Sequence, residues 1–224
     1  MVLIALAGCD IGSTSNGASN NQGGGGPLVC LGDSLTAGYG AATPGREDKT
    51  KSYPAYLQNK VRIPVINAGV SADTTSQGLA RVDIEVIPYD PQIVIILLGA
   101  NDFGRGIPIT AVRDNLQKII TKINNGKRMI YLAKFYTEEI AREMGNQYGL
   151  TDYIVQTVII NQLDSMYNTL ASENNIILIE DIWHGVWGVH MSDAVHPNAR
   201  GYEIMADNII NILLPYLQAN NLLN

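Results

Sequence analysis

Short apolar runs alternate with amphipathic stretches along most of the chain. The apolar runs are nearly continuous and rich in β-branched residues, which is typical of strands that are covered on both faces. We predict strands at residues 28–31, 64–68, 93–98, 129–133 and 176–179. The stretches between them carry apolar residues at helical spacing, and we predict helices at residues 52–61, 74–87, 109–123, 152–171 and 199–214.

The regular alternation of strand and helix predicts an α/β fold. Parallel strands joined by right-handed helical crossovers give a sheet with helices on both faces. We therefore expect a three-layer α/β/α domain around a five-stranded parallel sheet, of the flavodoxin-like kind. Pro215 should end or kink the last helix.

Composition limits the function classes. A chain of 224 residues, 46% of them hydrophobic, fits one well-filled domain. The net charge is −6 and basic residues are not clustered, so we expect no nucleic-acid partner. No apolar run reaches the roughly 18 residues that span a bilayer. Two cysteines cannot form a disulfide framework, and Cys30 lies in a predicted strand as a small buried hydrophobe.

The amino-terminal segment predicts an attachment signal. Residues 6–9 read Leu-Ala-Gly-Cys after an apolar stretch, and this run resembles the lipobox of bacterial lipoprotein signals. The resemblance implies cleavage before Cys9 and lipidation of that cysteine. Residues 10–26 are rich in Gly, Ser and Asn and predict a flexible tether. We expect a signal remnant at 1–9, the tether at 10–26 and a folded domain at 27–224. The location would be the bacterial cell envelope, periplasmic or membrane-anchored, with secretion as the alternative.

Polar residues follow three of the predicted strands. They lie in the runs 32–34, 67–75 and 99–102. The carboxyl ends of parallel strands share one edge of the sheet, where ligands bind in open α/β folds. We therefore expect these loops to be neighbours in space. Asp193 and His196 come just before the last predicted helix.

These residues suit nucleophilic serine catalysis, which needs a base, an acid that orients the base, and donors for the oxyanion. Ser34 is the candidate nucleophile and His196 the candidate base. Asp193, three residues before His196, can reach the Nδ1 side of its ring. The N–H groups of Ser34 and Ala72 and the side-chain amide of Asn101 are candidate oxyanion donors.

Each piece also has a structural interpretation. Ser34 with Asp33 could be a plain helix cap, and Asp193 with His196 a turn pair. Asn101 sits in a sequence with turn propensity. The chain has no Gly-x-Ser-x-Gly elbow, so the α/β-hydrolase arrangement is excluded.

We expect no metal and no cofactor. His184 and His190 flank Trp187 in an apolar segment, and we interpret both histidines as structural or pocket-lining. Their spacing from Asp181 and Asp193 matches no usual ligand pattern.

Taken together, the motifs resemble those of the SGNH/GDSL hydrolase family. The matching blocks are Gly-Asp-Ser-Leu at 32–35, Gly-x-Asn-Asp at 99–102 and Asp-x-x-His-Pro at 193–197. The runs 35–40, 76–81 and 104–106 are similar to the bacterial thioesterase I/arylesterase/lysophospholipase subgroup. The resemblance implies a flavodoxin-like fold and a cofactor-free serine ester hydrolase that works through an acyl-enzyme.

One block departs from the subgroup. It usually reads Gly-x-Ser-Gly-Asp-Thr, whereas residues 69–74 place Ala72 at the oxyanion-donor position. Alanine keeps its N–H, so the site suffers only if that backbone needs a positive φ. Gly69 is the fallback donor.

The substrate class stays open between two hypotheses. The first is an acyl ester or thioester, small or lipid-like, and the alternative is an acetylated polysaccharide; Trp183 and Trp187 suit either. A non-catalytic flavodoxin-like binding module is disfavoured, because no Gly-rich phosphate loop follows the first strand. We expect a monomer. Residues 135–152 would form a charged surface helix or a lid beside the site.

Overall fold

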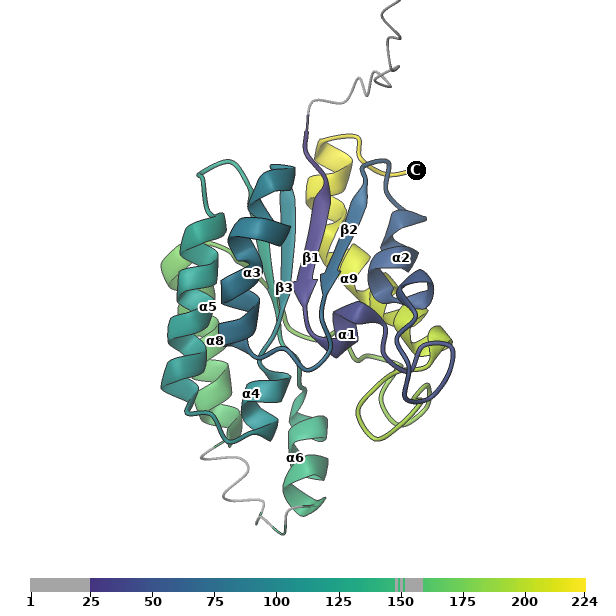
Figure 1. Cartoon of the computed structure of the whole chain (residues 1–224), viewed down its shortest axis with the longest axis vertical. Helices are drawn as coiled ribbons and strands as arrows, with labels where there is room; N and C mark the ends of the chain where they lie inside the picture. The colour runs from purple at the N-terminus through teal and green to yellow at the C-terminus, as the bar shows by residue number, and fades with distance from the viewer. Residues whose placement is uncertain (1–24, 148, 150, 152–158) are drawn as a thin grey trace, which may run out of the picture.

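A parallel sheet lies between two layers of helices in the computed structural model, which describes residues 25–147, 149, 151 and 159–224 (Figure 1). The predicted lipobox with Cys9, the tether apart from residues 25–26, and residues 152–158 of a predicted helix lie outside the described residues.

The sheet has the strand order β2-β1-β3-β4-β5, and all neighbouring strands are parallel. This confirms the predicted three-layer α/β fold. Every residue of the central strand β3 and of its neighbour β1 is buried, as their continuous apolar sequence predicts. The strands are β1 (Leu28–Gly32), β2 (Val65–Gly69), β3 (Ile93–Leu97), β4 (Met129–Ala133) and β5 (Ile177–Ile179).

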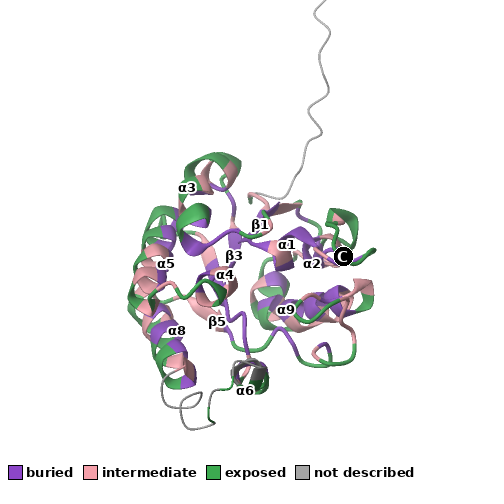
Figure 2. Cartoon of the chain, turned by 60° about the horizontal axis from the view of Figure 1, so that its bottom comes forward, coloured by how far each residue is buried: buried purple, intermediate pink, exposed green. Residues whose placement is uncertain are grey.

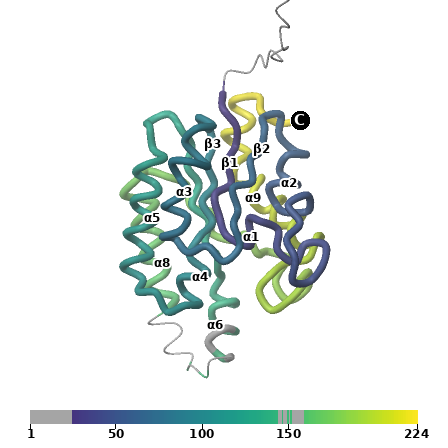
Figure 3. The backbone as a smooth tube through the Cα atoms, viewed as in Figure 1, coloured from purple at the N-terminus to yellow at the C-terminus, as the bar shows by residue number. Residues whose placement is uncertain are grey.

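Helices cover both faces of the sheet. On one face α2 (Tyr53–Gln58) packs against α9 (Ala199–Ala219). On the other, α5 (Ile109–Ile123) lies between α3 (Thr75–Glu85) and α8 (Asn161–Asn174) (Figures 1 and 3). Figure 2 shows the buried side of these helices turned toward the sheet. The buried stripe of α5 follows helical spacing and consists of Val112, Leu116, Ile119, Ile120 and Ile123.

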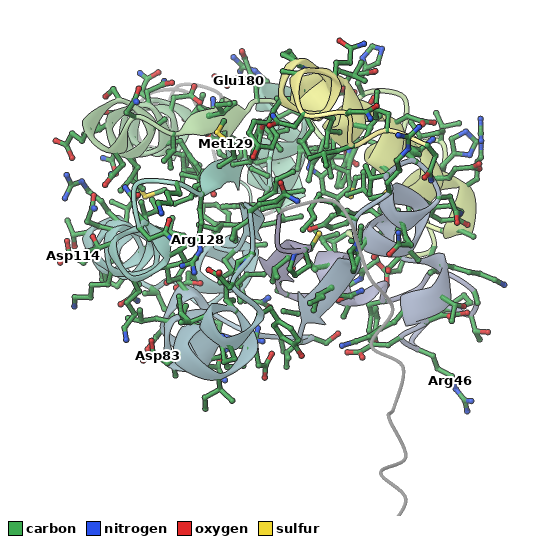
Figure 4. All side chains as sticks on the ribbon, turned by 90° about the horizontal axis from the view of Figure 1, so that it is seen from above. Arg46, Asp83, Asp114, Arg128, Met129 and Glu180 are labelled. Atoms are coloured by element: carbon green, nitrogen blue, oxygen red, sulfur yellow. The ribbon has the colours of Figure 1, made fainter. Side chains whose placement is uncertain are left out.

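Short helices fill the connections. They are α1 (Ser34–Ala37), α4 (Ala100–Gly104), α6 (Glu138–Gln147) and the 3₁₀ turns η1 (Lys49–Lys51) and η2 (Ile87–Tyr89). Charged side chains such as Arg46, Asp83 and Asp114 point outward at the rim of the molecule (Figure 4). Asp83 accepts a hydrogen bond from Lys122 at 2.5 Å, which joins α3 to α5.

The last helix differs from its prediction. α9 does not end at Pro215 but continues to Ala219. Leu213 and Leu217 on either side of the proline are fully buried. Their packing stabilises the helix although proline removes one backbone donor, so tertiary contacts override the local preference.

The sheet register brings the predicted loops together. Gly32 at the end of β1 is paired with Gly69 of β2 and with Leu97 of β3. The loops after these three strands therefore start side by side at the carboxyl edge, shown at the lower end of the sheet in Figure 1.

Candidate active site

Ser34 is presented at the carboxyl edge by a one-turn helix. The side chain of Asp33 caps α1 by accepting the N–H of Leu35 at 3.0 Å. Gly38 ends the helix in the left-handed region with φ +79°, a conformation that glycine adopts without strain. Ser34 is thus the first residue of α1, directly beyond the buried strand.

The fold joins Ser34 to the predicted base and acid, although His196 lies 162 residues away. The Oγ of Ser34 is 2.9 Å from Nε2 of His196. On the other side of the ring, Nδ1 is 2.9 Å from Oδ2 and 3.0 Å from Oδ1 of Asp193. This is the connectivity of a Ser-His-Asp triad.

Asp193 also stabilises the loop that carries His196. Oδ1 of Asp193 accepts the backbone N–H groups of Val195 at 2.9 Å and His196 at 2.8 Å. Burial opposes ionisation of Asp193, but the N–H of Val195 and the ring and N–H of His196 outweigh it and hold the pKa of that carboxyl below its usual value. An ionised Asp193 favours the proton on Nδ1, which leaves Nε2 free to accept one from Ser34.

Tyr39 supports the imidazole from one side. The two ring centroids lie 4.6 Å apart at an angle of 47°. The Tyr39 carbonyl accepts the hydroxyl of Tyr202 on α9 at 2.8 Å. The sequence does not predict this contact, because nothing in the spacing of Tyr39 links it to His196.

Asn101 reaches the site with both amide protons engaged. Its Nδ2 donates to the Asp73 carbonyl at 3.1 Å and to Oδ2 of Asp33 at 3.3 Å. The structure therefore joins Asn101 to the residue before Ser34, and Ser34 and Asn101 line the same cavity. A substrate oxyanion at this position would have to share, or replace, the longer hydrogen bond, which Asn101 donates to Asp33.

Ala72 adopts the conformation that its residue type disfavours. Its φ is +68°, in the left-handed region, which costs a non-glycine residue roughly 1–2 kcal/mol. No described residue accepts a hydrogen bond from the N–H of Ala72 or of Ser34. The N–H of Gly69, in contrast, donates to Oδ1 of Asn67 at 2.9 Å. The geometry thus favours Ala72 over the fallback Gly69.

Asp33 is the unexpected titratable group. It is 1% exposed, and burial raises its pKa to about 7 although the N–H of Leu35 and the amide of Asn101 stabilise the charge. The sequence predicts Asp33 only as a helix cap, because burial of a loop carboxylate depends on the tertiary structure.

A cavity of about 340 Å³ opens beside Ser34. Its polar lining is Ser34, Asn101, Arg105 and His196. Its apolar lining includes Leu35, Phe135, Ile140, Trp183, Trp187 and Val195. The two tryptophans line it as expected. His184 and His190 are not among its lining residues, and their carbonyls instead accept hydrogen bonds from Asn208 and Asn198.

The segment after β4 forms a wall of this cavity. α6 is a helix with charged residues, as one interpretation of residues 135–152 held, and Ile140 on it lines the cavity. Glu143 accepts the indole N–H of Trp187 at 2.7 Å, which joins α6 to the loop that carries His196.

In the part of the chain that the structure describes, no three His, Cys, Asp or Glu side chains are placed to hold a metal ion. Cys30 is buried, and burial raises the pKa of its thiol. Among the described residues, the helices are all too short or too polar to cross a membrane.

Comparison with known proteins points in one direction. Residues 30–204 match the model of the GDSL-like lipase/acylhydrolase family. The chain is 28% identical over 200 residues to an arylesterase of Vibrio mimicus, covering 85% of this chain and 89% of that one. It is 27% identical to thioesterase 1/protease 1/lysophospholipase L1 of Escherichia coli (strain K12), covering 84% and 83%.

Solved structures share the fold. The crystal structure of TesA superimposes with a TM-score of 0.68 at 25% identity and covers 84% of this chain and 98% of that chain. AlinE4, an SGNH-hydrolase family esterase, gives a TM-score of 0.58 at 30% identity, covering 86% and 97%.

Proposed function

Since the chain belongs to the GDSL-like lipase/acylhydrolase family and is a carboxylic ester hydrolase, we propose that it cleaves acyl esters and thioesters through an acyl-enzyme on Ser34. The observation that carries this proposal is the 2.9 Å contact between Oγ of Ser34 and Nε2 of His196. This distance is within the reach that proton transfer requires.

In the first half-reaction, Oγ attacks the substrate carbonyl while Nε2 of His196 takes its proton. Asp193 stabilises the imidazolium that forms. The C–O or C–S bond then breaks, and His196 returns the proton to the leaving alcohol or thiol. In the second half, water attacks the Ser34 ester by the same route and the carboxylic acid leaves.

The negative oxygen of each tetrahedral intermediate needs donors. The N–H groups of Ser34 and Ala72 and the amide of Asn101 would supply them. Removing one such donor costs about 2.7–4 kcal/mol in barrier in a well-studied serine protease. No cofactor takes part in this chemistry.

The cavity favours an acyl chain over a sugar ring. Trp183 and Trp187 meet edge to face at a centroid distance of 5.4 Å, which could suit a polysaccharide acetylesterase. However, Trp183 is 4% exposed and its indole N–H donates to the Phe135 carbonyl, and that of Trp187 is held by Glu143. Because both indole N–H groups are already bonded within the protein, the two tryptophans serve as part of the cavity wall. An acetylesterase would hydrolyse acetyl esters and acetylated xylan far faster than longer acyl esters.

Hydrolysis of p-nitrophenyl esters by Ser34→Ala tests the assignment. We expect kcat/KM to fall by about 10⁴-fold or more and labelling by a fluorophosphonate to disappear. Ser165→Ala changes an exposed serine on α8 and should retain wild-type turnover and labelling. Retained turnover in Ser34→Ala would contradict the proposal.

We further propose attachment to the cell envelope through a lipid on Cys9. The support is the Leu-Ala-Gly-Cys run and the polar composition of the residues that follow it.

A further inference from the structure

Arg105 contacts both chain segments that carry candidate oxyanion donors, the loop after β2 and the helix α4. Its Nη2 donates to the carbonyl of Ala72 at 2.7 Å. Its backbone N–H donates to the carbonyls of Asn101 at 3.1 Å and Asp102 at 3.2 Å, which closes the short helix α4. One residue therefore connects the loop after β2 with the helix that carries Asn101.

The loop after β2 needs such support. Ala72 has φ +68°, and a strained backbone persists only where its surroundings fix it. The next residue, Asp73, is fixed by the amide of Asn101 at 3.1 Å and by Nε of Arg81 at 2.7 Å. The contact on the Ala72 carbonyl itself is the one from Arg105.

We propose that Arg105 is a positioning residue of the oxyanion hole, which holds Ala72 in its left-handed conformation and so keeps its N–H directed at the reacting carbonyl. This inference rests on the proposed function, because it needs Ala72 as a donor. Without the guanidinium, Ala72 would relax toward negative φ and turn its peptide away. Arg105 is exposed, so its role is not to fill the core.

The first test is Arg105→Ala with the neutral ester p-nitrophenyl acetate. Loss of a whole donor costs about 10²–10³ in kcat, and a displaced donor should cost part of that, about 10- to 100-fold. The loss should appear in kcat with KM little changed, because the oxyanion forms only after binding. Arg113→Ala removes an arginine on α5 that pairs with Glu173 and should match wild type. An unchanged kcat in Arg105→Ala overturns the inference.

The second test is rescue by glycine. Glycine adopts positive φ without the penalty that alanine carries, so Ala72→Gly should make the loop less dependent on Arg105. In the Arg105→Ala background we expect Ala72→Gly to restore kcat by about fivefold or more. Strictly additive effects of the two substitutions would contradict a role through Ala72.

The third test separates positioning from recognition of an anion, since Arg105 also lines the cavity. An ester that carries a carboxylate, p-nitrophenyl hemisuccinate, is compared with the acetate. Positioning predicts the same loss of kcat for both esters. A loss confined to the hemisuccinate, with the kcat for the acetate unchanged, would show that Arg105 acts by binding an anionic substrate and would overturn the inference. Ser34→Ala in the same assay is the reference: if it stays active the proposed function fails, whereas an inactive Ser34→Ala with an unaffected Arg105→Ala refutes only the role of Arg105.

Discussion

Asp33 connects the helix that begins at Ser34 to the side chain of Asn101 through a single buried carboxyl group. One oxygen caps the helix of Ser34 and the other accepts the amide of Asn101. Because its pKa is raised to about 7 from 3.8, the folded protein should hold a proton here, between these two pH values, that the unfolded chain has lost. Protonation of Asp33 therefore makes the free energy of unfolding depend on pH.

The direction of this pH dependence follows from the linkage between proton binding and folding. A raised folded-state pKa gives stability that is fully present below the unfolded pKa of 3.8 and is lost as pH rises through about 7. We predict that the unfolding free energy of the wild type carries a contribution that falls by up to about 1.4 kcal/mol per pH unit in that window. Asp33→Asn should abolish this slope, whatever constant cost the substitution adds.

Urea unfolding at a series of pH values between 4 and 7 measures the slope. Asp114→Asn, at a side chain with 65% exposure, serves as the control and should keep the wild-type slope. If the unfolding free energies of the wild type and Asp33→Asn change with pH at the same slope, the raised pKa of Asp33 is contradicted.

At the scale of elements, α6 shapes the cavity from outside the sheet. Ile140 is 3% exposed and lines the cavity beside Ser34. We predict that Ile140→Ala lowers kcat/KM for hexanoyl esters by about 10-fold and leaves acetyl esters nearly unaffected, because a short chain does not reach this wall. Kinetics across acyl lengths check it. Ile84→Ala, at a side chain that is 73% exposed on α3, should change neither, and an equal loss for all chain lengths would contradict the role of α6.

α9 offers a prediction about stability. Pro215 lies inside the helix and is exposed, where it lacks the backbone donor that a helix uses. Pro215→Ala should raise the unfolding free energy by about 1–2 kcal/mol after the lost rigidity of the unfolded chain is counted. Pro44→Ala, in an exposed turn, should give no gain, because only the rigidity is lost there. Denaturant midpoints of both variants decide the matter.

The sequence predicts those features of the fold and the site that are determined by residues close together in the chain. The ranges 129–133 and 109–123 were predicted to the residue as β4 and α5, because apolar periodicity there continues to both ends. The capping residues at 33–34 predicted that a helix starts at Ser34, but no range was predicted for α1 and α4 was not predicted, since four and five residues show no periodicity. Motif spacing marks Ser34, Asp193 and His196 in the sequence, and the structure joins the three side chains by hydrogen bonds. The positive φ of Ala72, the pKa of Asp33 and the contact of Arg105 arise from tertiary neighbours that the sequence does not display.

At the scale of the whole molecule, the site and the start of the described chain lie at opposite ends of the sheet. The described chain begins at Gly25, just before the amino end of β1, and Ser34 follows its carboxyl end (Figures 1 and 3). A lipid on Cys9 would therefore hold the domain from the end that is remote from the cavity. Chemistry at Ser34 should then be independent of the anchor.

We predict that Cys9→Ser moves the protein from the detergent phase to the aqueous phase in Triton X-114 partitioning. Lipidation partitions a protein strongly, since each buried CH₂ contributes about 0.8 kcal/mol. Metabolic labelling with an alkyne fatty acid should disappear in the same variant, although Cys30 is still present in the core. Hydrolysis of a soluble ester should keep its kcat/KM, because the cavity lies at the other end of the sheet. A wild-type protein that carries no label and stays in the aqueous phase would refute the anchor while leaving the esterase assignment intact.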